Sequence, residues 1–156
     1  MTDSTIRALH FDGIKDRFVQ AFGVQPQGFH SVDAVLQSKA GNTTYFIEFK
    51  NGNFEIGQDV APKIPDSIIL YADIKDSKIE DIRTHCELIL VYNIDSKLLS
   101  DSESRDLKSR LHLYKKAERE MVRFDLRRYK GTYFRDVHTY DEDQFAEFLK
   151  KKAGDF

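Results

Sequence analysis

Two strand-like segments of this chain place charged side chains among apolar ones. Glu48 and Lys50 are two residues apart within 43–50, so both side chains should leave the same face of a strand. Asp33 is equally isolated among apolar neighbours, and a hairpin would bring it across from Glu48. Two acids held together repel each other and lose hydration, and one lysine compensates them only in part. The pattern therefore predicts a cation on Asp33 and Glu48, with Lys50 beside it.

Carboxylate oxygens of this kind suit Mg²⁺ or Mn²⁺, which takes one or two protein acids and leaves its other positions to water and substrate phosphate. A bound metal lowers the pKa of its water and polarises a phosphoryl group, while a nearby amine stabilises the developing charge. The expected chemistry is hydrolysis of phosphodiester bonds. The alternative interpretation of Glu48 and Lys50 is a solvated, salt-bridged strand face, which Asp33 argues against.

The elements that must position these residues follow an α/β order. A turn signal at 40–42 joins the two charged segments into an antiparallel hairpin. Residue spacing predicts a helix over 4–22, strands over 29–37 and 43–50, a short helix from Pro62 or Pro65 to 73, a strand over 88–92, a long helix from the capping box at 100–103 towards Gly131, a strand over 133–139 and a helix from Asp141. We expect one domain over residues 1–156. Its mixed four-stranded sheet should combine the hairpin with a β-α-β crossover and be flanked by helices.

The motif resembles the core of the PD-(D/E)XK nuclease superfamily, which has a restriction-endonuclease-like fold. It is carried by Ser31-Val32-Asp33-Ala34-Val35 and Phe46-Ile47-Glu48-Phe49-Lys50. The superfamily core is a helix, a three-stranded meander, a helix and a final strand. The expected order over about residues 4–140 matches it if the helix at 62–73 is an insertion. The resemblance implies that Asp33, Glu48 and the Phe49 carbonyl hold the metal, and that Lys50 orients or activates the attacking water.

Two departures accompany the resemblance. Val32 stands where the superfamily's namesake proline is found, and the acid that many members carry on the first helix could be Asp12 or Asp16. Lys63 and Asp66, on the helix after the motif, could also face the site.

The resemblance implies a DNA endonuclease or exonuclease. The alternatives are a catalytically silent module of the same fold that binds nucleic acid or protein, and a partner within a larger defence or recombination complex.

The basic charge is concentrated in one segment. Residues 103–131 carry ten basic and five acidic side chains, so this segment is +5 while the rest of the chain is −7. Such a segment could follow a phosphate backbone, and Arg127, Arg128 and Lys130 are the expected nucleic-acid-binding residues. For the other basic residues a solvated helix face is the better interpretation.

Composition narrows the class of protein further. The content is 40% hydrophobic and 32% charged, as in a globular protein, and the five histidines lack the spacing of a zinc site. Cys86 precedes an apolar run and is expected to be a buried thiol. The sequence contains no signal-peptide pattern and no membrane-spanning run, so we expect a cytoplasmic protein without a membrane partner. Double-strand cleavage would need two sites, which makes a homodimer the expected assembly.

Overall fold

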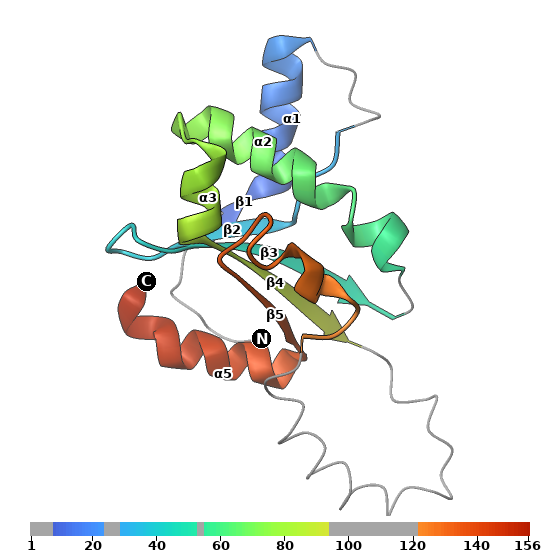
Figure 1. Cartoon of the computed structure of the whole chain (residues 1–156), viewed down its shortest axis with the longest axis vertical. Coiled ribbons are helices and arrows are strands. Elements are labelled where there is room, and N and C mark those ends of the chain that lie inside the picture. The colour runs from blue at the N-terminus through green and yellow to red at the C-terminus, as the bar shows by residue number, and fades with distance from the viewer. Residues whose placement is uncertain (1–7, 24–28, 53–54, 94–121) are drawn as a thin grey trace, which may run out of the picture.

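The computed structural model describes residues 8–23, 29–52, 55–93 and 122–156, whose strands form one mixed sheet (Figure 1). Neighbouring strands follow chain order from β1 to β5. The pairs β1–β2 and β2–β3 are antiparallel, whereas β3–β4 and β4–β5 are parallel. The strands are β1 Leu9–His10, β2 Ala34–Gln37, β3 Thr44–Asn51, β4 Cys86–Asn93 and β5 Asp136–Tyr140. The α/β class, the hairpin and the mixed sheet are thus confirmed.

The expected strand count of four is wrong, because β1 is a fifth strand. Leu9 and His10 pair with Val35 and Ala34, and the first helix begins only at Phe11. A strand of two residues is too short to show an alternating pattern, so the spacing of apolar residues predicted Leu9 as part of the helix that follows.

The strand expected from Phe29 begins at Ala34 instead. The preceding backbone groups bond to other elements: the N–H of His30 donates to Asp66, and that of Val32 to the Ser67 hydroxyl. The carbonyl of Asp33 accepts from the N–H of Phe11. Because their backbone groups are already bonded, these residues do not extend the ladder.

In the described residues, a π-helical turn at Ile56–Val60 and two α-helices, rather than one helix, connect β3 to β4. The α-helices are α2 Lys63–Lys75, close to its expected place, and α3 Ile79–His85, which the sequence did not predict. Because β3 and β4 are parallel, this connection is a crossover and not an insertion between antiparallel strands. The expected meander of the segments 29–37, 43–50 and 88–92 is therefore wrong.

The helices cover both faces of the sheet. Figure 1 shows α1 Phe11–Phe22, α2 and α3 on one side and α5 Glu142–Lys152 on the other. On the first side, here called the α2 face, Phe46, Leu88 and Leu90 join the larger apolar core. On the α5 face, Ile47 and Ile89 pack against half-buried residues of α5. The alternation along β3 thus sorts its side chains between two cores.

Most of the expected long helix, residues 100–121, lies outside the described residues. The described residues that follow do not continue an α-helix: Phe124 and Asp125 have φ values of 61° and 56°, and Leu126–Tyr129 forms a 3₁₀ turn. Left-handed backbone at these two residues is incompatible with a continuous right-handed helix. Across the described ranges, no helix combines the length and the apolar character needed to span a bilayer.

Candidate metal centre

Asp33, Glu48 and Lys50 meet at the carboxyl end of β3. Glu48 and Lys50 share the α2 face of the strand, and Glu48 is completely buried, with 0% of its surface exposed. Asp33 lies immediately before β2 and reaches the same side, since its carboxylate shares a lysine with Glu48. The structure thus brings the three predicted side chains into one cluster.

That shared lysine is Lys63, from the first turn of α2. Its Nζ lies 2.7 Å from Oε1 of Glu48 and 3.4 Å from Oδ1 of Asp33. The Lys50 Nζ lies 2.9 Å from the same Oε1 of Glu48. Lys63 therefore lies between the two acids, where the sequence predicted a metal ion.

The second oxygen of Asp33 is bound to the backbone of β3. The N–H of Phe49 donates to Oδ2 of Asp33 over 2.7 Å. The last β2 pairing in this direction joins Ala34 to Ile47, so the Asp33 carboxylate takes the place of a strand partner for Phe49. Within a strand, the N–H and C=O of one residue point to the same edge. The Phe49 carbonyl therefore points to the edge where Asp33 lies.

Burial and the two amines act on the cluster in opposite directions. Burial raises the pKa of Glu48 above its ordinary value, and hydrogen bonds from Lys63 and Lys50 offset this only in part. Burial acts to lower the pKa of Lys63, but its contacts with Glu48 and Asp33 outweigh that effect and raise it. Two acids and two amines balance in charge, so the repulsion that suggested a metal is weaker than the sequence indicated.

One polar atom in this cluster is left without a partner. Oε2 of Glu48 is buried and has no hydrogen-bond partner in the described part of the chain. A buried carboxylate oxygen in this state is costly, and it is the kind of group that a cation or a water satisfies.

The available donors fit a hard divalent cation. They are Oε2 of Glu48, Oδ1 of Asp33 and the Phe49 carbonyl, all of them oxygen atoms. The ranges described contain no group of three or more His, Cys, Asp or Glu side chains suited to a metal. Mg²⁺ and Mn²⁺ remain compatible, because they need only one or two protein carboxylates, whereas the donors do not suit zinc.

Of the two acids on the first helix, Asp12 contacts the segment that precedes Asp33. It accepts a hydrogen bond from the Ser31 hydroxyl, two residues before Asp33, and contacts Lys15 at 3.4 Å. Asp16 has a side chain 71% exposed and contacts Lys15 at 3.5 Å. The sequence left this choice open, and the structure favours Asp12.

Of the expected nucleic-acid-binding residues, Lys130 lies away from the centre. Lys130 pairs with Asp136 at 2.8 Å, and Asp136 is opposite Glu87, at the other end of β4 from Lys50. Arg128 lies over the ring of Tyr129 and contacts Asp125, while Arg127 is exposed. No contact joins these three residues to Asp33, Glu48 or Lys50 within the described ranges.

The roles of Lys63 and Ser67 in the cluster were beyond the sequence pattern. The sequence indicates Lys63 only as a residue that could face the site, and it assigns no role to Ser67. Ser67 is one helical turn after Lys63 and is fully buried, where its hydroxyl accepts from the N–H of Val32. A polar residue at this spacing on an otherwise apolar helix face was the available signal.

Comparisons of the chain with protein-family models, with curated proteins and with solved structures find no match. Any assignment of function must therefore come from the site itself.

Proposed function

We propose that this protein is a metal-dependent nuclease of the PD-(D/E)XK type that hydrolyses phosphodiester bonds in DNA. One observation carries the proposal: the buried Oε2 of Glu48 has no partner among the described residues, beside an Asp33 carboxylate and two lysines. A structural ion pair would be expected to satisfy both carboxylate oxygens. A cation bound to Oε2 of Glu48 would satisfy this oxygen.

The sheet topology supports the proposal. The strands β1, β2 and β3 form an antiparallel run, α2 and α3 cross over, and β4 returns parallel to β3. This order is close to the three-stranded meander, helix and strand of the restriction-endonuclease-like core. It differs in that α1 lies between β1 and β2 rather than before them, and in the additional strand β5.

In this proposal Asp33, Glu48 and the Phe49 carbonyl would hold Mg²⁺ or Mn²⁺. When bound, the cation would lower the pKa of a coordinated water and polarise the phosphoryl group. Lys50 orients the attacking water and offsets the charge of the phosphate. Lys63, whose Nζ contacts Oε1 of Glu48 and Oδ1 of Asp33, would add a second amine to offset the charge of the phosphate.

The proposal is tested by incubating single-stranded and duplex DNA with the protein in Mg²⁺, Mn²⁺, Ca²⁺ or EDTA. We expect cleavage in Mg²⁺ and Mn²⁺ but little in Ca²⁺, which is larger and less demanding in geometry. Asp33→Ala should abolish cleavage, whereas Asp73→Asn, an exposed acid of α2, should not. A wild-type protein that is folded and cuts no DNA in either metal contradicts the proposal.

A second candidate is a silent module of the same fold. The neutral arrangement of two acids and two amines favours it, because Lys63 already compensates the acids without a metal. This module would bind nucleic acid or protein without turnover. Calorimetric titration with Mg²⁺ separates the two candidates. The nuclease should bind Mg²⁺ as wild type and lose this binding in Asp33→Ala, whereas the silent module should give the same result for both proteins.

A further inference from the structure

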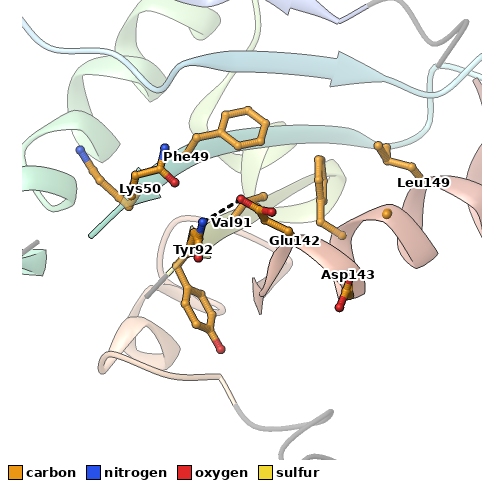
Figure 2. Close-up of a pocket in the computed structure, with 11 residues that line it drawn as sticks. Phe49, Lys50, Val91, Tyr92, Glu142, Asp143 and Leu149 are labelled. Atoms are coloured by element: carbon orange, nitrogen blue, oxygen red, sulfur yellow. Dashed lines mark hydrogen bonds between the residues drawn. The ribbon is translucent and has the colours of Figure 1, made fainter. Parts of the chain in front are cut away.

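A pocket of about 550 Å³ opens on the α5 face, at the same end of β3 as the candidate metal centre. It lies between the ends of β3 and β4 and the first turns of α5 (Figure 2). Phe49 and Phe145 supply aromatic surface, while Asn93, Glu142 and Asp143 supply polar groups. An apolar pocket with a few polar groups at its rim is the usual form of a site for a flat organic ligand.

The position of this pocket links it to the candidate metal centre through one strand. Glu48 and Lys50 face the α2 side of β3, and Phe49, between them, faces the α5 side. Beyond Ile47 no described strand pairs with the β2 edge of β3. A nucleic-acid strand crossing this end of β3 would therefore have a phosphate near Lys50 and the adjoining base near Phe49.

The aromatic surface is open to a ligand. Phe49 lies near the end of β3, beyond the last pairing with β2, and its side chain is 46% exposed. Its ring meets Phe145 edge-on, at 5.7 Å between centroids and 79° between planes. An edge-on partner leaves a face of the Phe49 ring available for stacking.

The charges of the pocket select against a phosphate group. Among its described lining residues Lys50 is the single cation, and its Nζ is paired with Glu48 on the other face. Glu142 and Asp143 make the pocket acidic. Oε1 of Glu142 accepts from the Asn93 amide over 3.0 Å, a contact dashed in Figure 2. These oxygens are suited to accept hydrogen bonds from an amino group, as carboxylates do from cytosine.

We propose that this pocket holds one unpaired, amino-bearing nucleobase of the strand that is cut at the candidate metal centre. The inference rests on the proposed function and adds its substrate class. A base can enter the pocket only after it leaves the stack, so the substrate is single-stranded DNA or DNA with an unpaired nucleotide beside the scissile phosphate. Phe49 provides stacking, and Glu142, positioned by Asn93, reads the amino group.

The test measures binding in EDTA by fluorescence anisotropy, so it depends on neither metal nor cleavage. The probes are labelled oligo-dC, oligo-dT and a duplex. Wild type should bind oligo-dC more tightly than oligo-dT or the duplex. Phe49→Ala should weaken oligo-dC binding about tenfold, the effect expected for the loss of one stacked base, and should leave duplex binding unchanged. Phe49→Ala keeps the backbone carbonyl, and Ile69→Ala removes another exposed apolar side chain, from α2, as a control.

Glu142→Gln should reduce the preference for oligo-dC over oligo-dT, whereas Glu147→Gln, further along the same helix, should not. The inference is overturned if wild type does not prefer oligo-dC, or if Phe49→Ala weakens single-strand and duplex binding equally or not at all. Failure of wild type to cut DNA in Mg²⁺ would count against the proposed function alone. Circular dichroism should show that Phe49→Ala is folded, so that weaker binding by this variant reflects the lost ring and not unfolding.

Discussion

Two glutamates on adjacent strands of this sheet each contact two nitrogen-bearing side chains, but the two carboxylates differ in how their oxygens are bonded. Glu48 lies on the α2 face, completely buried, with both amines on one oxygen and none on the other. Glu87 lies on the α5 face near the start of β4, with a side chain 13% exposed. Its Oε1 accepts from Arg135, and its Oε2 lies 3.0 Å from Nε2 of His138.

The pKa values of the two carboxyls follow this difference. Burial raises that of Glu48, whereas hydrogen bonds from His138 and Arg135 outweigh burial at Glu87 and lower it. A saturated ion pair needs nothing more and stabilises the fold. An unsaturated, more deeply buried acid is stable only with a further partner, which makes the Glu48 cluster the candidate for function.

The largest expected effect is on cleavage. Glu48→Gln should lower Mg²⁺-dependent cleavage by at least about a hundredfold, because it removes a proposed ligand charge. Glu87→Gln should leave cleavage unchanged, since that pair has no open oxygen. Initial rates on one labelled oligonucleotide, with circular dichroism to confirm folding, provide the measurement. Equal losses in the two variants would end the distinction between the clusters.

The next effect concerns the lysines and the free energy of unfolding. Without metal, Lys63→Met should cost about 3–5 kcal/mol, because it leaves a fully buried acid poorly compensated. Lys50→Met should cost less, since Glu48 keeps its 2.7 Å contact with Lys63. Urea unfolding with and without Mg²⁺ measures both. Mg²⁺ should recover part of the loss in Lys63→Met by replacing the missing cation.

Arg135→Met is the matched control, because it weakens the Glu87 pair and should not respond to Mg²⁺. If Mg²⁺ stabilises none of these proteins, the Glu48 cluster is an ion-pair network and the silent module becomes the better candidate.

The sequence predicted the parts of the centre that depend on strand alternation. Residue spacing alone put Glu48 and Lys50 on one face, and the turn at 40–42 brought Asp33 to them. The contact of Lys63 could not be predicted in the same way, because it depends on how α2 docks onto the sheet. The number of cationic side chains at the centre, and therefore its net charge, could not be predicted from the sequence.

The fold was predictable where an element is long enough to show a period. Strand β4 and the helix capped by Asp141 are examples, the latter confirmed by the Asp141 side chain accepting from the N–H of Gln144. Strand β1, with two residues, and helix α3, with seven, are too short for a periodic spacing of apolar residues to be recognised. Glu87 gave no signal either, because its partners Arg135 and His138 are about fifty positions away in sequence and meet it only through the β4–β5 pairing.

The smallest effect comes from pH and tests the saturated pair by itself. Several titratable groups surround Glu87: Arg135 and His138 contact it, and Tyr45, Asp136 and Lys152 lie nearby on β3, β5 and α5. The pKa of Asp136 is also lowered, against the effect of burial, by its hydrogen bonds from Lys130 and from the N–H of Val137. Its contribution is the same in wild type and in a Glu87 variant, so it cancels in their difference.

Because the folded-state pKa of Glu87 lies below its ordinary value of 4.5, ionised Glu87 favours the folded state. That stabilisation is complete above pH 4.5 and is lost as pH falls through the folded-state pKa. Wild type should therefore melt above Glu87→Gln at neutral pH, by about 1–4 °C for a pair worth up to about 1 kcal/mol, since the Arg135 side chain is 43% exposed. The gap should close in acid. Melting temperatures from pH 7 to pH 3 measure it, with Glu147→Gln as the control for an exposed pair. A gap that stays constant down to the lowest pH would mean that Glu87 acts through packing, and the contrast with Glu48 would then rest on burial alone.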